Sequence, residues 1–125
     1  MDIKDINELS NRIIGIAIEI HKTLKSGFNE KIYQEALQAE LKNNNIKFGR
    51  EKIIKVKYKD KLLGEQRIDF IVEDEIILEI KSTKEIGNIH IAQILSYLKT
   101  LNKRLGLILN FGESKLGIKR VVNGL

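Results

Sequence analysis

The sequence predicts an α/β domain of the α+β type, with helices flanking a mixed central β-sheet. Apolar residues recur at helical spacing in two segments near the N-terminus, alternate at strand spacing after residue 50, and return to helical spacing between residues 88 and 101. The chain has 125 residues, of which 42% are hydrophobic and 31% are charged. That size and balance are typical of one globular domain, so we expect a single domain over residues 1–125 with the order α-α-β-β-β-α-β-β.

Two amphipathic helices are expected before residue 46. The first is predicted over residues 5–25, with Asp5 as its N-terminal cap and Gly27 as a left-handed residue beyond its end. Its apolar positions are Ile6, Leu9, Ile13, Ile16, Ile20 and Leu24. The second is expected to begin after the capping residue Asn29 and to end at the polar run 43–45. Its apolar stripe consists of Ile32, Tyr33, Ala36, Leu37 and Leu41.

Three strands are expected next. In residues 54–58, Ile, Val and Tyr alternate with Lys, which is typical of a half-buried strand with a basic outer face. A turn at 59–61 leads to a strand over 67–72, and the acidic turn 73–75 leads to a strand over 76–81. The last of these is mostly apolar, which indicates a central strand.

The second half of the chain is expected to contain a crossover connection. Residues 88–101 have helical spacing and join the strand 76–81 to a short apolar run at 105–111. A helix between two strands of one sheet allows those strands to lie parallel, so we expect a parallel pair here. Residues 116–122 are predicted to form a final edge strand.

The composition excludes several kinds of site. The chain has no cysteine, which excludes disulfide scaffolds, cysteine-ligated zinc, iron–sulfur clusters and cysteine nucleophiles. No glycine-rich loop follows a strand, which disfavours nucleotide-cofactor folds. The N-terminus lacks the features of a signal peptide, and the most apolar run, residues 13–18, is too short to span a bilayer. We therefore expect a cytoplasmic protein that has no membrane partner.

The distribution of charge is more informative than its total. The formal net charge is +5, with 17 Lys and 5 Arg, and scattered lysines raise the isoelectric point without forming a binding surface. Residues 65–79, however, contain six acidic residues and one basic residue, while basic stretches occupy 52–61 and 99–120. This arrangement suits a cation held between surfaces that attract phosphate.

Charged residues inside apolar strands mark a candidate site. Asp69 lies within one apolar strand, and Glu79 and Lys81 flank Ile80 in the strand expected to be most buried. Residues two apart on a strand point to the same face, so Glu79 and Lys81 share a face. If residues 73–75 form the turn, Asp69 lies on the strand next to Glu79. Burying such charges is costly without partners, and either a Glu–Lys ion pair or a divalent cation with oxygen ligands would offset the cost.

These residues resemble a known nuclease signature. Asp69, followed across a hairpin by Glu79-Ile80-Lys81, is similar to the signature of the PD-(D/E)xK nucleases. The segment from Gly27 to Tyr33 resembles the GxxExxY motif of a small prokaryotic family in that superfamily. Two positions depart from these patterns, because Ile68 and Ser26 stand where many relatives have proline. Neither departure removes a metal-binding or acid–base group.

The resemblance implies a restriction-endonuclease-like core with a metal-dependent active site. Asp69, Glu79 and the backbone carbonyl of Ile80 would bind Mg²⁺ or Mn²⁺, and Lys81 would orient or activate the attacking water. Glu30 is implied as an additional metal ligand. The alternative for Glu30 is a carboxylate that interacts favourably with the N-terminus of its helix.

Other residues of the implied site have structural alternatives. Gln93 and Tyr97 share one face of the crossover helix and resemble the Gln-xxx-Tyr motif of RecB-like nucleases, which positions the site and its substrate. Their alternative is a surface glutamine beside a tyrosine at the core edge. Tyr33 is either a substrate contact or a core residue. His21 and His90 have no partner motif, so we expect both to be structural.

Two functions follow. The first is a metal-dependent nuclease that hydrolyses phosphodiester bonds of DNA or RNA, with Lys55, Lys57 and Lys99 contacting substrate phosphates. The second is a catalytically weak or inactive module of the same fold that binds nucleic acid or protein. The presence of Asp69 together with Glu79-Ile80-Lys81 favours the first. No separate specificity domain is visible, so we expect a homodimer or a partner protein to help select the substrate.

Overall fold

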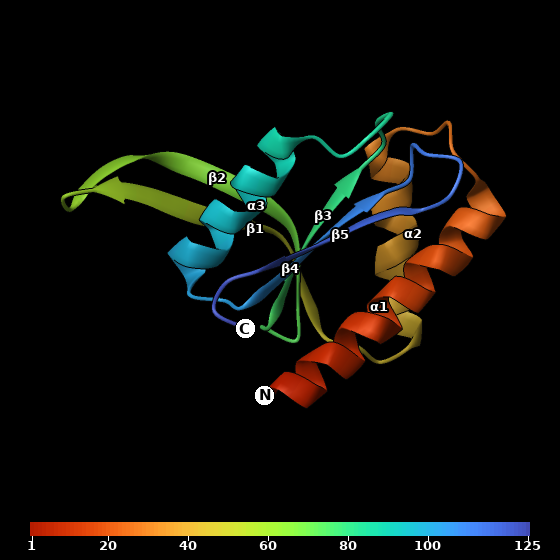
Figure 1. Cartoon of the computed structure of the whole chain (residues 1–125), viewed down its shortest axis with the longest axis horizontal. Coiled ribbons are helices and arrows are strands. Elements are labelled where there is room, and N and C mark those ends of the chain that lie inside the picture. The colour runs from red at the N-terminus through yellow and green to blue at the C-terminus, as the bar shows by residue number, and fades with distance from the viewer.

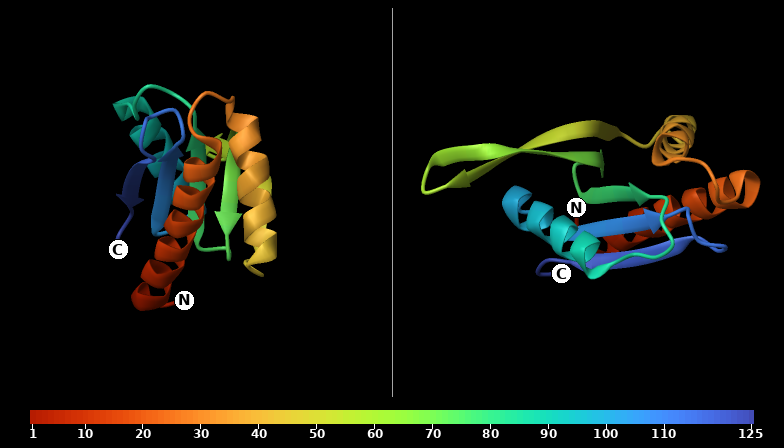
Figure 2. Two further views of the ribbon diagram at one scale, coloured as in Figure 1. Left: turned by 90° about the vertical axis from the view of Figure 1, so that its right-hand side faces the viewer. Right: turned by 90° about the horizontal axis from the view of Figure 1, so that it is seen from above.

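Helices cover both faces of a five-stranded sheet (Figure 1), and the computed structural model describes residues 1–125. The elements in chain order are α1 (Ile3–Leu24), α2 (Glu30–Asn43), β1 (Phe48–Tyr58), β2 (Lys61–Val72), β3 (Ile76–Lys81), α3 (Asn88–Leu101), β4 (Leu105–Asn110) and β5 (Gly117–Val122). Helices α1 and α2 pack on one face of the sheet and α3 packs on the other (Figure 2). The predicted α+β class and element order are confirmed. None of the three helices has the length and apolarity needed to cross a membrane.

The strands follow the chain in the order β1-β2-β3-β4-β5 across the sheet. Strand β3 pairs with β4 in parallel, and the other three neighbouring pairs are antiparallel. The parallel pair joined by α3 and the central position of β3 therefore agree with the prediction. Strand β3 is buried at every residue except Lys81, which is half-buried.

Two hydrophobic cores lie on opposite faces of the sheet. The larger contains 18 buried residues, including Leu78, and lies between the sheet and the helices α1 and α2. The smaller contains nine buried residues, including Ile77, and lies between the sheet and α3. Side chains alternate between the faces along a strand, and Ile80 belongs to the larger core. Glu79 and Lys81 therefore lie on the face that α3 covers.

The helix ends differ in part from the prediction. Helix α1 begins two residues earlier than expected, and the side chain of Asp2 caps it by accepting a 2.8 Å hydrogen bond from the backbone N–H of Asp5. Asp5 is thus a first-turn residue, and its predicted role as the cap is wrong. At the other end Lys25 adopts the positive φ of 60° that ends the helix, and Gly27 follows with a φ of 121°. Asn29 caps α2 as predicted.

Strands β1 and β2 are much longer than predicted. Both extend past the sheet as a two-stranded hairpin (Figures 1 and 2), and every residue from 55 to 67 is exposed. We call residues 55–67 the arm. The predicted half-burial of residues 54–58 holds only for Ile54, because Val56 and Tyr58 are 37% and 61% exposed. The reason is that β3 pairs with β2 only at Phe70–Val72, so the arm has no third strand beside it.

Candidate active site

The two carboxylates predicted to converge lie on neighbouring strands. In the β2–β3 register Phe70 is opposite Leu78, so the next position places Asp69 opposite Glu79. The Oδ2 atom of Asp69 accepts a 2.7 Å hydrogen bond from the backbone N–H of Ile80. This bond joins the two strands where their regular pairing ends and fixes the carboxyl group of Asp69 beside the peptide that follows Glu79.

Glu79 is the most perturbed acid in the protein. Its side chain is only 6% exposed, and its Oε1 atom has no hydrogen-bond partner. The pKa of Glu79 is raised from 4.5 to about 9, mainly by burial and also by the nearby negative charges of Asp69 and Glu30. A buried carboxylate oxygen without a partner is destabilising, so this group requires a proton or a cation. The oxygen donors of Asp69 and Glu79 fit a hard divalent cation such as Mg²⁺ or Mn²⁺.

Lys81 lies on the same face of β3 as Glu79. Its positive charge lowers the pKa of Glu79 and so partly opposes the effect of burial. The ammonium group forms no salt bridge, since the four ion pairs of the protein involve other residues. The alternative of a buried Glu–Lys ion pair therefore does not describe this site. The ammonium group of Lys81 remains available to a ligand.

A buried asparagine that no sequence pattern marks as functional holds the backbone beyond Lys81. Asn110 lies opposite Lys81 in the parallel β3–β4 pair and is fully buried. Its Oδ1 atom accepts hydrogen bonds from the N–H groups of Thr83 and Gly112, and its Nδ2 atom donates to the Thr83 carbonyl and to Glu113. The only sequence signal was an amide at the end of a strand that is otherwise apolar.

The backbone of Thr83 also limits what can stand at position 112. A Cβ atom added to Gly112 would overlap the Thr83 backbone, so the chain can pass this closely only with glycine there. The loop after β3 and the end of β4 are therefore in direct contact, and the N–H of Phe111 donates a 2.8 Å hydrogen bond to the Lys81 carbonyl.

Helix α3 places Tyr97 near the two carboxylates and Gln93 beside Tyr97. Burial raises the pKa of Tyr97, and the negative charges of Glu79 and Asp69 raise it further, while hydrogen bonding to Gln93 lowers it. The phenol oxygen therefore lies near both carboxylates. It also donates a 3.3 Å hydrogen bond to Oε1 of Gln66, a partner on β2 that no sequence pattern indicated.

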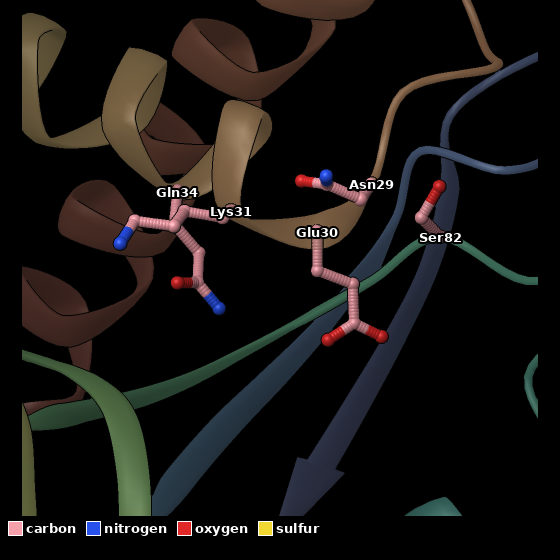
Figure 3. A pocket seen from close by; sticks show the side chains of 5 residues that line it. All are labelled: Asn29, Glu30, Lys31, Gln34 and Ser82. Carbon is pink, nitrogen blue, oxygen red and sulfur yellow. The ribbon is translucent and has the colours of Figure 1, made fainter.

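Glu30 lies in the first turn of α2, and its negative charge reaches Glu79. It lines an open polar cleft of about 570 Å³ together with Asn29, Lys31, Gln34 and Ser82, and its side chain extends away from the helix (Figure 3). No three Asp, Glu or His side chains in the protein converge as a preformed metal-binding group. The structure thus brings Glu30 near the two carboxylates of the strands without joining it to them.

Tyr33 is a core residue. It is fully buried, it stacks on Phe111 with 4.5 Å between ring centroids, and its hydroxyl donates a 2.6 Å hydrogen bond to the Lys25 carbonyl. The same hydroxyl accepts a 3.2 Å bond from the N–H of Phe28. These contacts hold the α1–α2 connection, and they correct the prediction that Tyr33 contacts substrate, because no part of the side chain is accessible.

The remaining predicted residues lie outside the group around Glu79. His21 is buried and bonds the Glu113 carbonyl, and His90 accepts from the N–H of Gly87 at the start of α3, so both have the expected structural roles. Lys99 is exposed and lies two residues beyond Tyr97, which places it on a different face of α3. Lys55 and Lys57 are exposed on the arm.

Comparison with known proteins agrees with this geometry. A profile of the PD-(D/E)XK nuclease superfamily matches residues 7–121. The chain belongs to the PD-(D/E)XK nuclease superfamily. Proteins of this superfamily are usually nucleases, which implies nucleic acid as the substrate, and they generally use divalent metals such as Mg²⁺. The superfamily signature in this chain consists of Asp69 and Glu79-Ile80-Lys81.

Among solved structures, the crystal structure of SSO0001 is similar to this superfamily member, with a TM-score of 0.59 and 19% sequence identity. The match covers 76% of this chain and 50% of the other, so this chain spans about half the length of SSO0001. At that identity the likeness concerns the fold alone. No curated protein matches the chain.

Proposed function

We propose that the protein is a metal-dependent nuclease that hydrolyses phosphodiester bonds of DNA or RNA at the site around Asp69 and Glu79. The observation that carries the proposal is the unpartnered Oε1 atom of Glu79, a buried carboxylate oxygen beside a second carboxylate. A divalent cation with oxygen ligands would satisfy this atom and offset both negative charges. Lys81 adds a positive charge that no internal ion pair uses.

In the proposed site, Asp69, Glu79 and the backbone carbonyl of Ile80 hold Mg²⁺ or Mn²⁺. When bound, the ion lowers the pKa of a coordinated water and neutralises charge that develops on the phosphate. The hydrogen bond from the Ile80 amide to Asp69 supports this assignment, because it fixes the carboxylate of one strand against the peptide of the other. Glu30 contributes additional negative charge from the start of α2.

The other side chains of the site act on the substrate and the attacking water. Lys81 orients the water and contacts a non-bridging phosphate oxygen, for which the compact charge of an ammonium group is suited. Tyr97 borders the substrate beside the two carboxylates, and Gln93 and Gln66 hold its phenol in place. The hydrogen bond between Tyr97 and Gln66 supports this role, since it ties α3 to β2 next to Asp69.

We further propose that the chain is a member of the GxxExxY family and acts in the cytoplasm. The segment from Gly27 to Tyr33 supports the family, because Gly27, Glu30 and Tyr33 stand at the spacing of its motif. We also propose that a homodimer or a partner protein helps to select the substrate.

Cleavage of labelled DNA and RNA, single-stranded and double-stranded, tests the proposed activity with Mg²⁺, with Mn²⁺ and with EDTA. We expect Asp69→Asn, Glu79→Gln and Lys81→Met each to reduce the rate by about a hundredfold or more, because each removes a ligand or a charge at the phosphate. Asp74→Asn and Lys42→Met remove the same charges at exposed positions and serve as matched controls. Mn²⁺ titration by calorimetry gives a second readout, in which Asp69→Asn loses the binding site.

Equal cleavage by the wild type and all three site variants would refute the proposed function. Nucleic-acid binding without metal-dependent cleavage would instead favour the inactive binding module, and the Mn²⁺ titration would then show whether the cation site exists.

A further inference from the structure

The arm is exposed along its whole length, and the proposed active site does not use it. Both of its strands leave the body of the protein (Figures 1 and 2), and none of its residues belongs to either hydrophobic core. An isolated two-stranded hairpin is marginally stable in water, and packing against a further element is what normally stabilises one. An extended pair of uncovered strands next to an active site therefore calls for a ligand that covers it.

The residue content of the arm indicates what that ligand is. The arm has five basic and two acidic residues, a net charge of +3, and the basic residues are Lys55, Lys57, Lys59, Lys61 and Arg67. Between them lie exposed apolar side chains, of which Tyr58 is 61%, Leu62 51% and Leu63 60% exposed. Protein–protein interfaces are depleted in lysine, whereas phosphate groups attract it. The charge thus favours a nucleic acid over a second protein.

The arm is also continuous with the active site. Arg67 stands two residues before Asp69 on β2, and Gln66 forms the hydrogen bond with Tyr97. This hydrogen bond holds the base of the arm against α3, close to Asp69 of the proposed active site. A nucleic acid bound along the arm passes directly to the site.

The shape of the arm favours one form of nucleic acid. The axes of two paired antiparallel strands lie about 5 Å apart. With its side chains, such a ribbon fits the major groove of B-form DNA, which is about 12 Å wide. The deep, narrow major groove of an A-form RNA helix excludes such a ribbon. Apolar side chains on the arm match thymine methyl groups in the groove, and lysines match the phosphates and the guanine edges.

We propose that the arm lies in the major groove of double-stranded B-form DNA and holds the duplex at the active site. The inference rests on the nucleic-acid substrate of the proposed function and does not require hydrolysis. The tip residue Asp60 is nine residues from Asp69, which corresponds to about 30 Å of strand or about nine base pairs. Substrates therefore need about that length of duplex on one side of the scissile phosphate.

Binding measured by fluorescence anisotropy in EDTA tests the arm without any cleavage. The probes are a labelled DNA duplex of about 20 base pairs, its separate strands and the RNA duplex of the same sequence. We expect Lys55→Gln with Lys57→Gln to weaken duplex DNA binding by about tenfold or more and to lower the slope of log K against log salt by about 1.8. Lys4→Gln with Lys42→Gln removes two exposed charges outside the arm and is expected to leave both quantities unchanged.

Apolar variants give an independent readout. Leu62→Ser with Leu63→Ser is expected to weaken duplex DNA binding without changing the salt slope, because neither side chain carries charge. Both residues are exposed, so the fold is retained, and circular dichroism checks this. The weakening caused by the lysine and leucine variants is expected on the DNA duplex and to be absent on the RNA duplex and the single strands.

Three outcomes would overturn the proposal. Equal weakening by the arm lysines and the control lysines would show a general charge effect. Equal weakening on the RNA duplex would exclude insertion into the major groove. A shift from dimer to monomer in sedimentation of the leucine variant, with DNA binding unchanged, would make the arm a surface for a second copy of the chain.

The binding assay also separates this proposal from the proposed activity. Arm-dependent duplex binding by a protein that cleaves nothing would support the arm and refute hydrolysis. Metal-dependent cleavage with no arm-dependent binding would refute the arm alone.

Discussion

Strand β2 takes part in two hairpins that share its residues but have opposite surroundings. The hairpin it forms with β3 is covered on both faces and contains Asp69 and Glu79, whereas the hairpin it forms with β1 becomes the uncovered arm. Both turn through two residues at positive φ, which are Lys59 and Asp60 in the arm and Glu73 and Asp74 in the other hairpin. The turns of the two hairpins are thus similar. The β2–β3 hairpin is part of the body of the fold because a further strand and helices pack against it.

The comparison predicts unequal costs for the same substitution. Leu78→Ala in β3 removes a fully buried side chain and is expected to lower the free energy of unfolding by about 2–5 kcal/mol. Leu63→Ala in the arm removes an exposed side chain and is expected to change the free energy of unfolding by less than about 0.5 kcal/mol. Urea unfolding measures both. Similar losses would mean that the arm packs against the protein in solution.

Asn110 stabilises the covered hairpin next to Lys81, and its loss is expected to have a smaller effect than the loss of Leu78. Asn110→Ala leaves part-buried backbone groups of Thr83 and Gly112 without partners and is expected to lower the free energy of unfolding by about 1–3 kcal/mol. The exposed Asn88→Ala is the matched control in the same unfolding experiment. We also expect cleavage to fall in Asn110→Ala at a temperature where the protein is still folded, since the position of Lys81 depends on this residue. Retained activity there would assign Asn110 to stability alone.

The pH dependence of stability tests the covered carboxyl group. The folded state holds the proton of Glu79 up to a pKa of about 9, while the unfolded chain loses it near 4.5. The contribution of Glu79 to the free energy of unfolding is therefore complete below pH 4.5. It falls as pH rises toward 9, by at most about 1.4 kcal/mol per pH unit. Unfolding in EDTA at several pH values should show this fall in the wild type and not in Glu79→Gln. Mg²⁺ should restore stability at the alkaline end, because it binds the ionised group. Identical pH profiles for the two proteins would contradict the burial argument.

The smallest expected effect is in the turn of the arm. Lys59 and Asp60 adopt φ values of 47° and 66°, which asparagine and glycine adopt with less strain. Lys59→Asn with Asp60→Gly is expected to slow amide hydrogen exchange in residues 55–65 by a factor that corresponds to less than about 1 kcal/mol. Because the arm contributes nothing to the cores, global unfolding should remain unchanged. A rise in global stability would show that the arm and the body unfold together.

How far the sequence could predict the molecule depends on whether a feature is local. Alternation along a strand was sufficient to place Glu79 and Lys81 on one face and Asp69 beside them, because the pleat and a short acidic turn determine that geometry. The same alternation predicts burial for Val56 and Tyr58, and this is wrong, because both are exposed. Alternation shows which residues share a face of a strand, but it does not show whether a core covers that face.

Contacts between distant segments could not be predicted from the sequence for a related reason. The bonds of Asn110 to the loop after β3, and of Gln66 to Tyr97, join positions that only the assembled sheet and helices bring together. Neither residue type is unusual in a strand end or an exposed strand. The predicted cap of α1 is wrong because Asp2 and Asp5 are equally able to begin a helix. Packing in the folded chain decides between them, and the cap is Asp2.

The separation of the arm from both cores has a consequence for how this protein changes over time. Substitutions at 55–65 alter the surface of the arm without removing any packing that holds Asp69 or Glu79, so selection can act on the arm and on the site independently. We expect an exchange of residues 55–65 for the corresponding segment of another PD-(D/E)XK superfamily protein with such a hairpin to leave the melting temperature unchanged. The chemistry would then be inherited with the body of the protein, while the choice of duplex would be free to diverge.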